Sequence, residues 1–161
     1  MTNPTAPDRD LRSAELARAA IREGRPTSWF DELYSAGTRG EIGMPWDRQA
    51  PLPLVTDYFA AHPLVPASRA MVIGCGLGVD AEYLSGLAAE NGSSVTAFDI
   101  SETAIKFARA RYLSSTVDYR VANLLKLPPV WIGAFGLATV RIDKAPSAAT
   151  GPGAMAMRWL A

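Results

Sequence analysis

The chain has 161 residues, no net charge at neutral pH and a hydrophobic content of 48%. This size allows one domain with a buried core, and the balanced charge gives no basic surface for nucleic acid. The single cysteine, Cys75, excludes an internal disulfide framework. We expect no signal peptide, because the first residues are polar and contain no apolar segment. No apolar run approaches the ~20 residues of a membrane helix. We therefore expect a cytoplasmic protein that binds neither nucleic acid nor membrane.

The first 65 residues are predicted to form a helical segment in front of the core. Residues 1–12 are polar and are expected to fray. The elements expected after them are a helix at 13–24, an aromatic helical turn at 29–34, a loop at 35–53 and a helix at 54–61 that His62-Pro63 closes.

The central part of the chain alternates apolar runs with helical patterns. The predicted strands are 70–73, 95–99, 117–121 and 134–140, and the predicted helices run from about 80 to 90 and from 101 to 112. Ser101 is the expected N-cap of the second helix. Strands that alternate with helices indicate an α/β fold with a parallel sheet and flanking helices. We assign residues 66–143 to this core.

Three alternating glycines interrupt the first of these patterns. Gly74, Gly76 and Gly78 follow the first strand, and Asp99 ends the second strand. Glycines permit a tight turn, a close approach of a ligand to the backbone and close packing of the next helix. Because ligands of open α/β sheets bind at the carboxyl ends of the strands, Asp99 is placed to accept hydrogen bonds from ribose hydroxyls. The layout predicts a site for an adenosine-bearing cofactor.

Two cofactors are compatible with this loop. A dinucleotide places its pyrophosphate on the helix N-terminus, where an anion is favoured. Asp80 stands at that position in this chain, and its carboxylate disfavours a second anion and suits a cation. S-adenosyl-L-methionine carries a sulfonium and an ammonium group and no phosphate, so we favour it over NAD. Asn123, directly after the third strand, is expected to meet the adenine edge, although an Asx turn is the alternative.

The chain resembles the class I S-adenosylmethionine-dependent methyltransferases in the segments VIGCGLGVD (72–80), AFDIS (97–101), SETAIKFAR (101–109) and ANLLKLP (122–128). Within them it resembles the thiopurine S-methyltransferase-like branch, on Gly74-Cys75-Gly76 with Asp80, Trp29 and the stretch around Pro45-Trp46-Asp47. The resemblance implies a Rossmann-like fold and a lid in which Trp29 covers the cofactor. The predicted cofactor-binding residues are Trp29, Gly74, Cys75, Gly76, Gly78, Asp80, Asp99, Ile100, Asn123 and Leu124. Asn123 stands where family members often carry Asp.

The final segment, 144–161, is rich in small residues and is predicted to be an irregular tail without a strand. The resemblance implies a sheet of more strands than can be read here, so we expect the C-terminal strands to be absent. A truncated or frame-shifted C-terminus would explain this. The strand at 134–140 would then be a sheet edge, with low stability or association through that edge as the expected consequence.

The predicted reaction is methyl transfer to a small molecule, with a thiol as one candidate acceptor. A thiol ionises near neutral pH and needs no dedicated base, so no catalytic residue is assigned, and no metal is expected. His62 is predicted to be a helix-end residue, and Cys75 a packed one. Two alternatives stay open, which are a non-catalytic cofactor-binding remnant and a fragment of an NAD-dependent oxidoreductase. Neither the acceptor nor the oligomeric state follows from the sequence.

Overall fold

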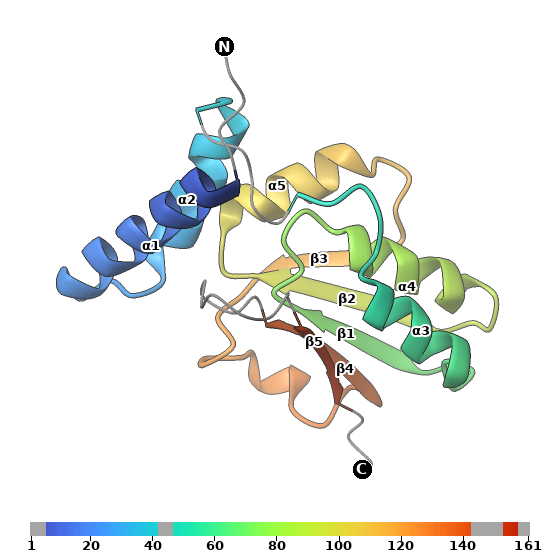
Figure 1. The fold of residues 1–161 in the computed structure, drawn as a ribbon. Coiled ribbons are helices and arrows are strands. Elements are labelled where there is room, and N and C mark those ends of the chain that lie inside the picture. Colours follow the sequence, from blue (N-terminus) through green and yellow to red (C-terminus); the bar gives the residue numbers. More distant parts are fainter. Residues whose placement is uncertain (1–5, 42–46, 143–152, 158–161) are drawn as a thin grey trace.

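The computed structural model describes residues 6–41, 47–142 and 153–157 (Figure 1). The helices are α1 (Ala6–Arg22), α2 (Ser28–Thr38), α3 (Pro53–Ala61), α4 (Val79–Ala89) and α5 (Glu102–Arg111), with a short 3₁₀ helix η1 (Pro129–Trp131). The strands are β1 (Arg69–Ile73), β2 (Ser94–Asp99), β3 (Asp118–Val121), β4 (Leu137–Ile142) and β5 (Gly153–Met157).

The five strands form one sheet in the order β3-β2-β1-β4-β5. β1, β2, β3 and β4 are parallel, whereas β5 runs antiparallel to β4. In the middle of the sheet, Val72 of β1 lies opposite Ala97 of β2 on one side and Thr139 of β4 on the other. The predicted α/β fold with a parallel sheet and flanking helices is confirmed. Because the four strands point the same way, their carboxyl ends share one edge of the sheet.

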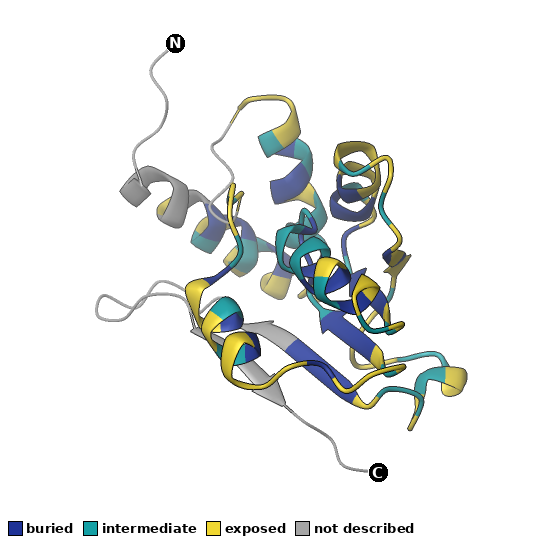
Figure 2. Ribbon diagram, turned by 90° about the vertical axis from the view of Figure 1, so that its right-hand side faces the viewer, coloured by how far each residue is buried: buried dark blue, intermediate teal, exposed yellow. Residues whose placement is uncertain are grey.

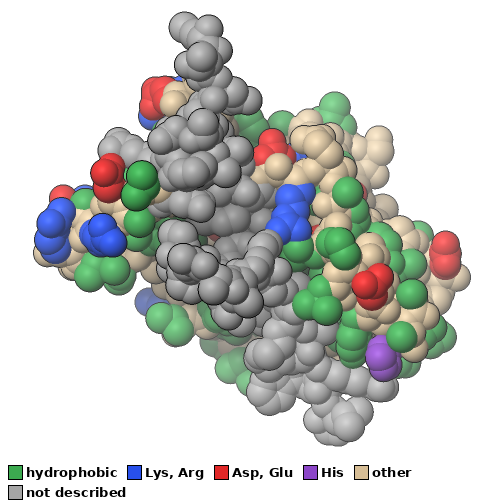
Figure 3. Space-filling view, in the orientation of Figure 1, with side chains coloured by type: hydrophobic (Ala, Val, Ile, Leu, Met, Phe, Trp, Pro, Cys, Tyr) green, Lys and Arg blue, Asp and Glu red, His purple; other side chains and the backbone are tan. Residues whose placement is uncertain are grey.

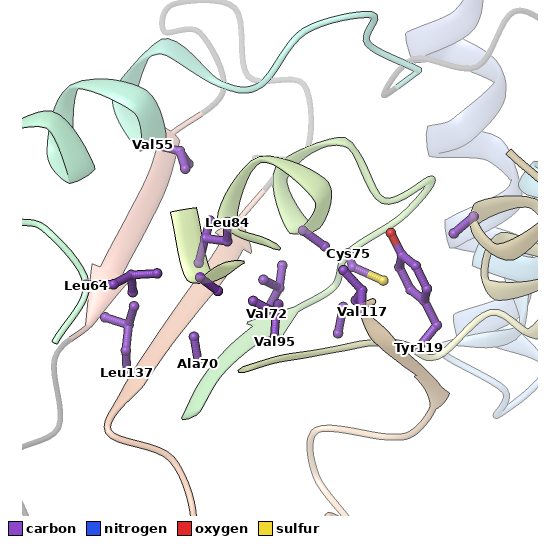
Figure 4. Close-up of a cluster of buried hydrophobic side chains, with 14 of the residues drawn as sticks. Val55, Leu64, Ala70, Val72, Cys75, Leu84, Val95, Val117, Tyr119 and Leu137 are labelled. Carbon is purple, nitrogen blue, oxygen red and sulfur yellow. The ribbon is translucent and has the colours of Figure 1, made fainter. Parts of the chain in front are cut away.

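One face of the sheet is covered by α3, α4 and α5 and holds the main core (Figures 1 and 4). As the period of two requires, alternate residues of β1 and β2 point to this face, which are Ala70, Val72, Val95 and Ala97. Leu84 of α4 and Ile105 of α5 are almost fully buried there. Helix α3 adds Val55 and Phe59 to the same cluster. This packing makes α3 part of the core although it precedes residue 66.

The opposite face of the sheet carries a smaller apolar cluster. Met71, Phe98 and Ala138 point to it, one each from β1, β2 and β4. The connection between β3 and β4 covers them, because Trp131 of η1 packs on Phe98 with ring centroids 5.5 Å apart. Much of this connection is exposed on its outer side (Figure 2). Among the residues that the structure describes, this connection shields apolar side chains of the sheet from water.

Three boundary predictions are wrong. β5 pairs with β4 at 153–157, in the segment for which no strand was expected, so β4 is not a sheet edge. The pairing with β4 makes residues 153–157 a strand, because their own sequence has no strand pattern. Helix α1 begins at Ala6, within residues expected to fray, and α2 continues to Thr38, into the expected loop. The other residues of the predicted tail, 144–152 and 158–161, lie outside the described residues.

Candidate cofactor-binding site

The glycine loop connects β1 to α4 at the carboxyl edge of the sheet. Gly74, Gly76 and Gly78 have φ angles of 66°, 54° and 90°, so all three adopt the left-handed region that disfavours other residues. Cys75 donates its backbone N–H to the carbonyl of Phe98, which holds the loop against the end of β2. The loop therefore presents backbone, without side chains at three positions, where the sequence predicts the cofactor.

Asp99 fastens this loop to β2. Its Oδ2 accepts a hydrogen bond from the Gly76 N–H at 2.9 Å, and its Oδ1 accepts one from the Ser101 N–H at 2.9 Å. The side chain is 7% exposed. Asp99 thus lies beside the glycine loop as predicted, but in this structure its described partners are backbone amides that set the shape of the loop.

Tyr119 of β3 packs against the last glycine of the loop, Gly78. Its hydroxyl donates a hydrogen bond to Oε1 of Glu82 at 2.7 Å and lies 3.4 Å from the carbonyl oxygen of Gly78. A Cβ atom on Gly78 would stand 2.3 Å from that hydroxyl. Burial, together with the hydrogen bond to Glu82, raises the pKa of Tyr119 far above its ordinary value. The hydroxyl therefore stays protonated and keeps donating.

Asp80 lies in the first turn of α4, and its Oδ1 accepts a hydrogen bond from the backbone N–H of Leu52 at 2.9 Å. That contact ties the start of α3 to the start of α4. Glu82 adds a second carboxylate to the same turn. Two acidic side chains at a helix N-terminus disfavour a pyrophosphate there. The residues present fit a cationic, phosphate-free ligand better than a dinucleotide.

The remaining predicted residues occupy different surroundings. Cys75 is buried within the core cluster, as expected of a packed residue (Figure 4). Ile100 is half-buried between Asp99 and Ser101. Asn123 and Leu124 are exposed directly after β3, and Oδ1 of Asn123 accepts from the Leu125 N–H at 2.9 Å. That bond is the Asx turn that sequence analysis held as the alternative to an adenine contact.

Helix α2 docks against the start of α5, at the same edge of the sheet (Figure 1). Oδ1 of Asp31 accepts hydrogen bonds from the Ser101 hydroxyl at 2.7 Å and from the Thr103 N–H at 2.9 Å. Trp29, also on α2, is half-buried and stacks on Phe30 with ring centroids 3.9 Å apart. The predicted lid residue thus belongs to a helix that is anchored beside Asp99. Trp46 lies outside the described residues.

Sequence analysis missed Asp31, Tyr119 and Glu82. Each acts through a contact between segments far apart in the chain, and Asp31 and Ser101 are 70 positions apart. The one local signal was Ser101, whose predicted capping role is confirmed because its hydroxyl accepts from the Ala104 N–H.

His62, the one histidine of the sequence, is the helix-end residue that the sequence predicts. Its side chain is exposed (Figure 3, purple) and its ring stacks on Tyr58 with centroids 4.6 Å apart. No group of three or more His, Cys, Asp or Glu residues that could hold a metal occurs in the described parts of the chain. Among the same residues, no helix combines the length and the apolar character needed to cross a bilayer.

The parallel sheet, the glycine loop and the acid at the end of β2 define a Rossmann-like fold. Residues 70–143, just under half of the chain, match the family described as "Methyltransferase domain".

Two curated relatives are ubiquinone biosynthesis O-methyltransferases. The protein from Xanthomonas campestris pv. campestris (strain B100) is 34% identical over 103 residues, which cover 58% of this chain and 41% of that protein. The protein from Xanthomonas oryzae pv. oryzae (strain PXO99A) is 32% identical over 103 residues, which again cover 58% of this chain and 41% of that protein. This chain therefore spans about two fifths of the length of the curated relatives it matches.

One solved structure is similar in both sequence and fold. It is described as "Conversion of a Disulfide Bond into a Thioacetal Group during Echinomycin Biosynthesis" and is 34% identical, with a TM-score of 0.51 over 62% of this chain and 42% of that one. The family match and these relatives show that the central segment of the chain is similar to methyltransferases. They do not support the thiopurine S-methyltransferase-like branch.

Proposed function

We propose that this chain binds S-adenosyl-L-methionine at the carboxyl edge of β1 and β2 and transfers its methyl group to a small organic acceptor. The observation that carries the proposal is the bond between the Asp99 carboxylate and the Gly76 N–H, at 2.9 Å. It joins the two predicted cofactor-binding features, the side-chain-free loop and the strand-end acid, in one place. The matches to methyltransferases over the same segment support this assignment.

In this proposal the loop at Gly74, Gly76 and Gly78 approaches the cofactor through its backbone, and Asp99 accepts from the ribose. Asp80 adds negative charge near the cationic end, while Asn123 and Leu124 lie on the adenine side. Trp29, Cys75 and Ile100 complete the predicted set. The cofactor supplies the reactive methyl group and its own leaving group. The protein's part is to hold acceptor and methyl in line and to exclude water.

The acceptor atom is oxygen in the first version of the proposal, because the curated relatives are named as O-methyltransferases. A phenol with an ordinary pKa near 10 is mostly neutral at pH 7, so an oxygen acceptor needs a group that takes its proton. A sulfur acceptor is the second version, and the solved relative concerned with a thioacetal favours it. A thiol with a pKa near 8.5 supplies its own nucleophile.

A matched pair of acceptors separates the two versions. The chain is incubated with methyl-labelled S-adenosylmethionine and aromatic acceptors that differ only in a phenol or a thiol group. Preferential labelling of the phenol supports the first version, and preferential labelling of the thiol supports the second. Binding of S-adenosylhomocysteine without labelling of either acceptor would favour the alternative of a non-catalytic binding remnant. Binding of NADH instead would favour the oxidoreductase alternative.

A further inference from the structure

We infer that Asp31 is a positioning residue that couples the docking of α2 to the shape of the glycine loop. This inference rests on the proposed function, because the loop is the proposed cofactor site. Asp31 itself touches neither Asp99 nor the loop in any described contact. Its effect passes through Ser101, which bonds to both carboxylates.

The first link joins α2 to the start of α5. Asp31 Oδ1 accepts from the Ser101 hydroxyl at 2.7 Å and from the Thr103 N–H at 2.9 Å. Ser101 is fully buried, and its hydroxyl oxygen also accepts from the Ala104 N–H. Since the hydroxyl donates to Asp31 while accepting from the helix, one orientation of the side chain satisfies both bonds. Asp31 thereby fixes the Ser101 side chain.

The second link joins Ser101 to the loop. The Ser101 N–H donates to Oδ1 of Asp99, and Oδ2 of the same carboxylate accepts from the Gly76 N–H, both at 2.9 Å. A shift of Ser101 would therefore move or rotate the Asp99 carboxylate and loosen the Gly76 amide. Bonds to charged acceptors are stronger than neutral ones, so each of the two carboxylates holds its donors firmly.

The chain provides a matched control at the same helix contact. The Ser35 hydroxyl, also on α2, lies 3.2 Å from the Thr103 hydroxyl. Removing it with Ser35→Ala weakens the contact of α2 with α5 but leaves the bonds of Ser101 and Asp99 in place. Asp31→Asn is the conservative variant, because the amide oxygen keeps an acceptor at the position of Oδ1. Asp31→Ala removes the acceptor.

The test measures hydrogen exchange of the Gly76 amide by nuclear magnetic resonance and the dissociation constant of S-adenosylhomocysteine by calorimetry. We expect Asp31→Ala to speed exchange at Gly76 and to weaken binding about tenfold, a typical size for coupling between sites. Asp31→Asn is expected to recover most of both effects, and Ser35→Ala to leave both close to wild type. Wild-type exchange and binding in Asp31→Ala, or equal losses in Ser35→Ala, would overturn the inference.

Two further results keep the inference separate from the proposed function. If the wild-type chain does not bind S-adenosylhomocysteine, the proposed function fails, while exchange at Gly76 still decides whether Asp31 controls the loop. If Asp31→Ala does not fold, the test uses Ser101→Ala instead. Alanine keeps the backbone N–H that donates to Asp99, but it removes the hydroxyl that donates to Asp31. Wild-type exchange at Gly76 in folded Ser101→Ala would overturn the inference.

Discussion

The hydroxyl of Tyr119 lies 3.4 Å from the carbonyl oxygen of Gly78, so the last glycine of the loop rests directly on a side chain of β3. A Cβ atom at Gly78 would also come within 3.3 Å of the Ala108 Cβ on α5. The loop is therefore confined from two elements. Glycine at this position is required by the space around it as well as by its φ of 90°.

We expect Gly78→Ala to destabilise the fold more than Gly92→Ala. Both glycines have left-handed φ angles, 90° and 72°, so both substitutions carry a backbone cost of about 1–2 kcal/mol. Gly92 has nothing within 4 Å of an added Cβ, whereas Gly78 meets the Tyr119 hydroxyl at 2.3 Å. Overpacking adds roughly 1–3 kcal/mol at Gly78 alone. Urea unfolding followed by circular dichroism measures the difference, and equal costs would contradict the account.

Tyr119→Phe is expected to change how stability depends on pH in alkaline solution. The unfolded tyrosine has a pKa of 10.0, whereas burial and the bond to Glu82 raise the pKa in the folded state. Above pH 10 the unfolded chain thus loses a proton that the folded chain keeps, so rising pH favours unfolding. The wild type should lose up to about 1.4 kcal/mol per pH unit through this group, and Tyr119→Phe should lack that contribution. Parallel pH profiles for the two proteins would contradict the assignment.

The carboxylate of Asp31 should act at the opposite end of the pH scale. Burial alone raises its pKa, but the bonds from Ser101 and Thr103 outweigh it and hold the pKa below the ordinary value of 3.8. A depressed pKa contributes stability above pH 3.8 that is lost as the pH falls through the folded value. We expect the stability advantage of wild type over Asp31→Asn to disappear in that acid range. Acid unfolding curves that stay equally separated at every pH would contradict it.

Trp131→Ala is expected to uncover the face of the sheet that carries the smaller apolar cluster. Trp131 packs on Phe98 and belongs to the smaller apolar cluster, whereas its neighbour Val130 is 78% exposed. Truncating the partly buried tryptophan should cost about 2 kcal/mol, and Val130→Ala should cost little. Binding of a hydrophobic dye should rise in Trp131→Ala only. A similar rise in Val130→Ala would contradict the role given to the Trp131 side chain.

The centre of the fold could be predicted because its patterns are strong. β1 and β2 are short apolar runs bounded by turn residues, and the run at 70–73 ends at the glycines that begin the loop. Both faces of these two strands are covered in the structure, so a continuous apolar run is what a central strand needs. The glycine loop and Asp99 were therefore predicted side by side, and the structure joins them directly.

The ends of the fold could not be predicted, because other segments determine them. β5 is the short sequence Gly-Ala-Met-Ala-Met, which has no strand pattern of its own and forms by pairing with β4. Helix α1 contains Pro7 in its first turn, a position that proline tolerates, so the polar start was misread as frayed. Helix α2 continues through Gly37, which was interpreted as a loop residue.

The contacts that shape the site were also beyond the sequence. Nothing near Asp31 indicates that it bonds to Ser101, and nothing near Asp80 indicates that it bonds to Leu52. Such bonds depend on how helices dock in three dimensions. The residue types of the site were thus predictable, but the network that positions them was not.

Calorimetric titration of the chain with S-adenosylhomocysteine and, separately, with NADH tests the central claim most directly. The side-chain-free loop, Asp99 beside it and the two acidic residues at the start of α4 predict saturable binding of S-adenosylhomocysteine and none of NADH. Binding of NADH with no heat from S-adenosylhomocysteine would contradict the account.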